Sequence, residues 1–167
     1  EPEVAVLRLG HRPGRDERTT THVGLTARAL GADRVVLPAG AGEALETVRE
    51  VTDRFGGPFA VESTGSPLGV VRAWDGAVVH LTMYGEPLQD VSADLAARHR
   101  AGPMLVVVGG GKVPGEVYER ADRNVAVTNQ PHSEIASLAV FLDRLFDGRQ
   151  LDRDWADAER VVVPQAR

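Results

Sequence analysis

Short, unbroken apolar runs alternate along this chain with segments that have helical spacing. Val4–Leu9 and Met104–Val108 have the length of strands, whereas Glu43–Phe55 places its apolar residues at helical intervals. Continuous apolar runs are typical of strands that are covered on both faces of a sheet. The alternation therefore predicts an α/β fold, with a mostly parallel sheet flanked by helices.

The expected elements fill a chain of 167 residues, a length that suits one domain. We expect a single domain over residues 1–167, in which residues 151–167 form a C-terminal extension with one further short strand at Arg160–Val163. The other predicted strands are Val4–Leu9, Arg34–Pro38, Phe59–Glu62, Ala77–Met83, 103–108 and Asn124–Thr128. The predicted helices run from about Thr21 to Gly31 and over Glu43–Phe55, Ser66–Trp74, Leu88–Arg100, 113–122 and 133–146.

Composition excludes several kinds of site. The chain has no cysteine, which excludes disulfides, thiolate metal sites and cysteine nucleophiles. Its five histidines do not pair at metal-ligand spacing, so we predict no metal, and we expect His80 in the core because it lies within an apolar run. Apolar runs are too short to cross a bilayer, and we expect a cytoplasmic protein. The net charge of −5 argues against a simple nucleic-acid binder unless basic groups gather locally.

Four polar loops follow predicted strands. They are residues 10–22 (GHRPGRDERTTTH), 81–87 (LTMYGEP), 109–115 (GGGKVPG) and 128–134 (TNQPHSE). Ligands of parallel α/β sheets bind at the carboxyl ends of the strands. These four loops are therefore the predicted location of the functional site.

The loop GGGKVPG fails the two phosphate-binding patterns that it suggests. The phosphate loop needs a glycine where Val106 stands and a Ser or Thr where Val113 stands. The dinucleotide fingerprint needs a glycine where Pro114 stands. Three consecutive glycines still predict that a ligand or another part of the backbone approaches this loop closely.

The loop TNQPHSE is richer in polar groups than a turn requires. Asn129 or Ser133 alone would cap the helix that follows. A cap leaves Gln130, His132 and Glu134 unexplained, and the start of a helix also presents free backbone N–H groups. This loop is predicted to bind a ligand.

The first polar loop carries a local excess of positive charge. Arg8, Arg12, Arg15 and Arg18 lie close together in an acidic protein. The alternatives are a solvated loop with internal ion pairs and a surface that holds phosphates, and we favour the second.

Four strings together resemble one known family. LRLGHRPGRDERTTTHVGLTARALGA, HLTMYG, VVVGGGKVP and NVAVTNQPHSEIASLAVFLDRLF are similar to the archaeal tRNA (cytidine-56) 2'-O-methyltransferases, which belong to the SPOUT superfamily. The resemblance runs from about Val4 to Leu151. It implies a C-terminal deep trefoil knot, a homodimer, S-adenosylmethionine as cofactor, and methylation of the 2'-oxygen of cytidine-56 in the T loop of tRNA. The helix Ile135–Phe146 is then expected to be the knotted helix and part of the dimer contact.

The resemblance also implies which residues bind the cofactor. The family usually has an acidic residue directly before the lysine, where this chain has Gly111. Glu116 and Glu134 are candidates for the role of that acid. The residues that match the cofactor-binding strings are Leu81, Gly109, Gly110, Gly111, Lys112, Val113, Val127, Thr128, Asn129, Gln130, Pro131, His132, Ser133 and Glu134.

Methyl transfer requires that the 2'-hydroxyl be placed in line with the methyl group and lose a proton. In related knotted enzymes an arginine near the first loop assists at the ribose. The predicted catalytic residues are Arg18, then Arg12, with His22 as a candidate base. An arginine is too weak an acid to act as the base, so its expected role is to hold a phosphate or lower the pKa of the hydroxyl.

Three alternatives remain open from the sequence. The first is a knotted methyltransferase that acts on another RNA nucleotide. The second is a relative that binds RNA without catalysis, a reading to which Gly111 gives some support. The third is a nucleotide-dependent oxidoreductase, which the failed glycine pattern disfavours.

Overall fold

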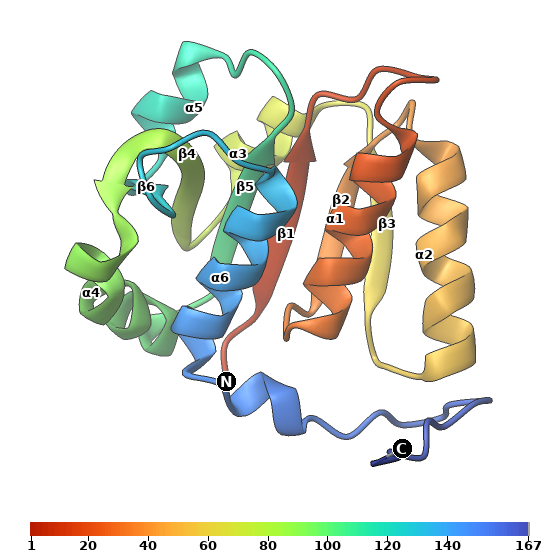
Figure 1. Ribbon diagram of the computed structural model, residues 1–167. Helices are drawn as coiled ribbons and strands as arrows, with labels where there is room; N and C mark the ends of the chain where they lie inside the picture. Colours follow the sequence, from red (N-terminus) through yellow and green to blue (C-terminus); the bar gives the residue numbers. More distant parts are fainter. Residues whose placement is uncertain (167) are drawn as a thin grey trace.

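The computed structural model describes residues 1–166 and has one six-stranded sheet between two layers of helices (Figure 1). The strand order is β3-β2-β1-β5-β4-β6, and every neighbouring pair is parallel. The strands are β1 (Val4–Leu9), β2 (Arg34–Pro38), β3 (Ala60–Thr64), β4 (Ala77–Pro87), β5 (Met104–Gly109) and β6 (Arg123–Ala126). The helices are α1 (Glu17–Ala29), α2 (Gly42–Phe55), α3 (Pro67–Ala73), α4 (Leu88–Ala101), α5 (Gly115–Arg120), α6 (Glu134–Phe146) and the short 3-10 helix η1 (Arg149–Asp152). The predicted α/β class and parallel sheet are confirmed.

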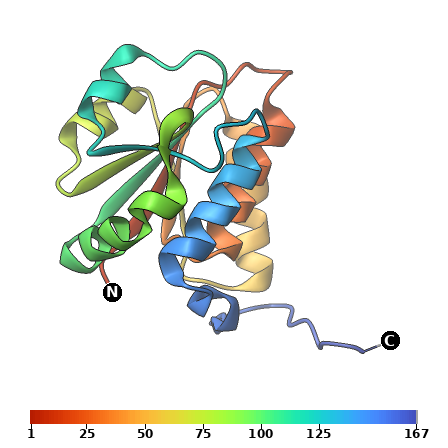
Figure 2. The same cartoon turned by 60° about the vertical axis from the view of Figure 1, so that its left-hand side comes forward.

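Two hydrophobic layers cover the sheet, as the unbroken apolar strands predict. Along β1, Val4 and Val6 face one layer while Ala5 and Leu7 face the other, which is the two-residue period of a strand. Helices α1, α2, α4 and α6 pack on the first face, and α3 and α5 on the second (Figures 1 and 2). Within residues 1–166, no helix is long and apolar enough to span a membrane.

Strand β4 is longer than predicted because its ladder with β6 is interrupted and then resumes. Leu81 pairs with Val125, and so does Glu86, so the residues between them leave the ladder as a hump. The side-chain amide of Asn129 donates to the backbone oxygens of Met83 (2.8 Å) and Gly85 (3.1 Å). The loop after β6 therefore holds the hump in place.

Helix α1 begins four residues earlier than predicted, inside the polar loop. The imidazole of His11 lies 2.7 Å from Thr20 Oγ1 and 3.0 Å from Glu17 Oε1, and it joins the loop to the first turns of the helix. Polar composition suggested an irregular loop, but these side chains satisfy one another and allow the helix to start at Glu17.

The predicted strand at Arg160–Val163 is wrong. Residues 160–163 have no strand partner, and Val161, Val162 and Val163 are 70–79% exposed. The tail is attached elsewhere, through Gly57 N–H to Ala156 O (3.0 Å) and Arg160 N–H to Arg54 O (2.8 Å). It lies past the end of α2, away from the carboxyl ends of the strands (Figure 1), so its β-favouring valines have no sheet edge to join.

Candidate active site

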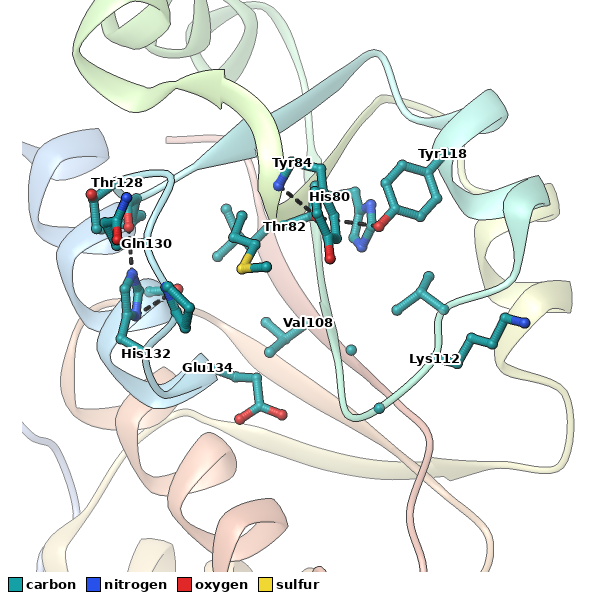
Figure 3. Close-up of a pocket in the computed structure, with 18 residues that line it drawn as sticks. His80, Thr82, Tyr84, Val108, Lys112, Tyr118, Thr128, Gln130, His132 and Glu134 are labelled. Atoms are coloured by element: carbon teal, nitrogen blue, oxygen red, sulfur yellow. Dashed lines mark hydrogen bonds between the residues drawn. The ribbon is translucent and has the colours of Figure 1, made fainter.

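A pocket of about 540 Å³ opens at the carboxyl ends of β4 and β5 (Figure 3). The hump of β4 and the loops after β5 and β6 form its walls, which are three of the four predicted segments, whereas the first polar loop, residues 10–22, contributes no lining residue. Eleven of the predicted cofactor residues line it: Leu81, Gly109, Gly111, Lys112, Val113, Val127, Thr128, Gln130, Pro131, His132 and Glu134. Three segments far apart in the sequence thus meet around one cavity.

The other three predicted cofactor residues do not line the pocket. Asn129 is turned toward the β4 hump, and Ser133 caps α6, where its hydroxyl accepts from Ile135 N–H at 3.1 Å. Gly110 packs against the guanidinium of Arg8. One residue of TNQPHSE is therefore the helix cap, and most of the others face the cavity.

Seven lining residues were missed by the cofactor prediction: His80, Thr82, Met83, Tyr84, Val108, Tyr118 and Ser137. Four of them belong to β4 and its hump, and they lie within the string HLTMYG, so this string could have predicted them as lining residues. Tyr118 and Ser137 come from α5 and α6, and no loop motif marks them. Tyr84 is 76% exposed and lies at the pocket beside Thr82 (Figure 3).

Each glycine of the GGG loop is required for a different reason. A Cβ on Gly109 would overlap the side chain of Val113, and one on Gly110 would overlap Nη2 of Arg8 and lie 2.8 Å from its Cζ. Gly111 has open space around it but a φ of +78°, a conformation that other residues adopt only with strain. The predicted close approach of another part of the backbone is confirmed at Gly110, whose N–H donates to Leu9 O at 2.9 Å, and side chains of the protein also approach the loop.

Arg8 does not belong to the exposed basic loop. It lies in β1, its side chain is 1% exposed, and Nη1 contacts Glu134 Oε1 at 3.3 Å. Its Nε makes no hydrogen bond within residues 1–166. The prediction that Arg8 holds phosphates is therefore wrong, because the strand that carries it is covered on both faces.

His80 lines the pocket as a neutral imidazole with a defined tautomer. The amide of Asn124 donates to Tyr118 O (3.0 Å), which leaves Asn124 Oδ1 to accept from His80 Nδ1 at 2.9 Å. Burial lowers the pKa of His80. Nε2 is therefore unprotonated, and it is buried without a partner among residues 1–166.

His132 closes the NQPHSE loop through contacts of both ring nitrogens with backbone oxygens. Nε2 contacts Val127 O, and Nδ1 lies 3.0 Å from Ser133 O. Carbonyl oxygens only accept hydrogen bonds, so these two contacts favour the protonated ring. The hydrogen bond to Val127, and then that to Ser133, raises the pKa of His132 above 6.5.

The stability that this loop contributes to the fold should consequently depend on pH. Because the folded-state pKa of His132 is raised, its contribution to stability is present below pH 6.5 and is lost as the pH rises through the folded-state pKa. We expect the melting temperature of His132→Gln to lack this decrease, since glutamine does not titrate. An NMR titration in which His132 has a pKa at or below 6.5 would contradict the assignment.

The three predicted catalytic residues lie outside the pocket lining. Arg12 is 61% exposed and is bound to Asp16 through Nε (3.0 Å) and Nη2 (3.1 Å). That guanidinium lowers the pKa of Asp16 to about 2. Arg18 is exposed and His22 half-buried on α1, a helix that begins at the same edge of the sheet as the pocket (Figure 1).

Of the two candidate acids, only Glu134 faces the pocket. Glu116 is held by Arg72 Nε (2.6 Å) and Arg120 Nε (2.8 Å). These two arginines lower the pKa of Glu116 to about 2. Within residues 1–166, no three His, Asp or Glu side chains gather as metal ligands.

Comparison with known proteins assigns this architecture to a family. The model of the family described as "tRNA ribose 2'-O-methyltransferase, aTrm56" matches residues 55–167. The chain belongs to the aTrm56 family. A relative from Natronomonas pharaonis, named tRNA (cytidine(56)-2'-O)-methyltransferase, is 66% identical over 99% of this chain and 92% of its own length. One of the same name from Thermococcus kodakarensis is 52% identical over 98% of this chain and 93% of its own length.

The fold of this aTrm56 chain also occurs in solved SpoU methyltransferases. The chain is similar to AviRb from Streptomyces viridochromogenes, solved in complex with AdoMet, with a TM-score of 0.60 at 13% identity. The match covers 89% of this chain and 58% of AviRb. The predicted SPOUT-type architecture is thereby confirmed. The aTrm56 description also removes the oxidoreductase alternative.

Proposed function

We propose that this chain transfers a methyl group from S-adenosylmethionine to the 2'-oxygen of cytidine-56 in the T loop of tRNA. The observation that carries the proposal is the pocket formed by the β4 hump and the loops after β5 and β6, in a chain of the aTrm56 family. The names of the relatives supply the substrate.

The pocket suits an adenosyl ligand in size and chemistry. Its volume of about 540 Å³ lies in the range of about 300–1,000 Å³ for small-molecule sites. Leu81, Val108 and Val127 offer apolar contacts, and the glycine loop exposes backbone near them. Buried His80 Nε2 and the Glu134 carboxylate add polar groups. Leu81 and residues 109–113 and 127–134 would hold the cofactor.

When bound, S-adenosylmethionine supplies a methyl group that is already activated on a sulfonium. The residues of this chain then have to position the ribose, exclude water and accept the hydroxyl proton. An arginine side chain cannot serve as the base in a protein, so Arg18 and Arg12 would hold a phosphate or stabilise negative charge on the 2'-oxygen. His22 is the proposed proton acceptor.

The larger assembly is part of the proposal. We infer a homodimer that uses α6, on which Val140 is exposed. We also infer a knot, formed where residues 127–133 lead from β6 to α6 past the β4 hump. Arg15, Arg18 and Lys112, exposed at the pocket edge of the sheet, supply positive charge for tRNA in a protein of net charge −5. The cytoplasm is the expected compartment.

The substrate is tested with an unmodified tRNA transcript and labelled S-adenosylmethionine. Mapping the product should place one methyl group on the ribose of cytidine-56. A transcript with 2'-deoxycytidine at that position should accept none. Methylation at another nucleotide would favour the first alternative, and no methylation with intact RNA binding would favour the non-catalytic relative.

The catalytic assignment is tested by Arg18→Ala. We expect methyl transfer to fall by about 100-fold or more, while calorimetric affinity for S-adenosylmethionine stays unchanged because Arg18 does not line the pocket. Arg15→Ala, at an exposed arginine of the same loop, is the matched control and should lose far less. If the two variants show equal rates, Arg18 has no catalytic role.

A further inference from the structure

Charged side chains are few in the lining of the pocket. Among residues 1–166, Lys112 is the one lining Lys or Arg, and Glu134 is the only lining Asp or Glu. A ligand with a net positive charge therefore finds one carboxylate to pair with. The carboxylate of Glu134 projects from the start of α6 into the space beside the glycine loop (Figure 3).

The Glu134 carboxylate is anchored on one side only. Oε1 contacts Nη1 of Arg8 at 3.3 Å, and the two side chains are 34% and 1% exposed, respectively. The contact leaves Oε2 available to the cavity. Glu134 is thus oriented by a group beneath it and accessible from the pocket above it.

Arg8 is placed where it cannot itself hold the ligand. Its guanidinium lies behind Gly110, is almost completely buried and does not line the pocket. Replacing buried ion pairs with apolar residues is often neutral or stabilising, so packing alone does not account for an arginine with an unpaired Nε at this position. Its one ion pair among residues 1–166 is with the carboxylate that faces the pocket.

The other acidic side chains discussed above contact basic groups outside the pocket. Glu17 lies against His11, Asp16 binds Arg12, and Glu116 is held by two arginines. None of the three lines the pocket.

We propose that Glu134 recognises the positive charge of the sulfonium of S-adenosylmethionine, and that Arg8 is a positioning residue that orients its carboxylate. The inference rests on the proposed function. It gives the site a means to release its product, because S-adenosylhomocysteine has lost the sulfonium charge and with it the attraction to Glu134. The vacant acid position at Gly111 is then compensated from another element, α6.

The test compares the affinities of the full chain for S-adenosylmethionine and S-adenosylhomocysteine by calorimetry. We expect Glu134→Gln to weaken S-adenosylmethionine by about 10-fold or more and S-adenosylhomocysteine by less than about 3-fold, since only the first carries the sulfonium charge. Glu119→Gln, at an exposed acid next to the lining Tyr118, should leave the ratio unchanged. Equal losses for both ligands in Glu134→Gln overturn the inference.

The role of Arg8 is tested through the same affinity ratio. Arg8→Met should lower the preference for S-adenosylmethionine in the wild-type background and leave it unaltered in the Glu134→Gln background, and Arg8→Lys should restore part of it. Additive effects in the double variant overturn the positioning role. If Arg8→Met does not fold, Arg8→Lys in both backgrounds decides the same question. A wild-type chain that binds neither ligand would instead overturn the proposed function, and the inference with it.

Discussion

Gly110→Ala is expected to destabilise the protein by about 3 kcal/mol and to abolish binding of S-adenosylmethionine. The new methyl group would overlap Nη2 of Arg8 and lie 2.8 Å from Cζ. Arg8 has no free space to move into because its side chain is 1% exposed, so the clash combines overpacking with disruption of its ion pair with the partly exposed Glu134. Urea denaturation gives the stability, and calorimetry gives the affinity.

Gly115→Ala is the control for this experiment. A Cβ at Gly115 meets no atom within 4 Å, and its backbone does not have a positive φ. Alanine there should change neither the urea midpoint nor the affinity. If Gly110→Ala has the same urea midpoint and the same affinity as Gly115→Ala, the glycine loop does not pack tightly on Arg8.

Much of the fold follows from the sequence because both faces of the sheet are covered. Unbroken apolar runs such as Met104–Val108 have no other stable location, and the loops that follow them must reach the same edge. The three strings that match the cofactor site accordingly converge on one pocket. The C-terminal valines show the limit, since strand propensity without an adjacent sheet edge does not make a strand.

The errors at the site arise where a charge lies within an apolar element. Arg8 was grouped with the surface arginines by proximity in sequence, although the strand that carries it is buried. Its partner Glu134 is 126 residues away, a distance that no local pattern spans. Tyr118 and Ser137 line the pocket because of the way in which α5 and α6 are oriented about their own axes. That orientation is set by packing and is not visible in a loop motif.

Gly85→Ala is expected to have an effect of similar size in the β4 hump, which carries other residues to the pocket. A Cβ there would lie 2.5 Å from the backbone C of Asn124 and the backbone N of Val125. Because these atoms belong to the backbone of β6, no side-chain rotation relieves the clash, and β4 and β6 must separate. We expect a loss of about 3 kcal/mol and faster amide exchange over Arg123–Ala126, measured by hydrogen exchange.

The same change should reach the ligand site, since the hump between Leu81 and Glu86 carries Met83 and Tyr84 to the pocket. If the hump is displaced, Asn129 loses its two backbone acceptors, and affinity for S-adenosylmethionine should fall with stability. Gly102→Ala, with open space and an extended backbone, is the matched control. If the amide exchange rates across β6 in Gly85→Ala equal those of the wild-type chain, the close packing of the hump on β6 is contradicted. In that case the contacts of Asn129 with the hump would be what holds this wall of the pocket.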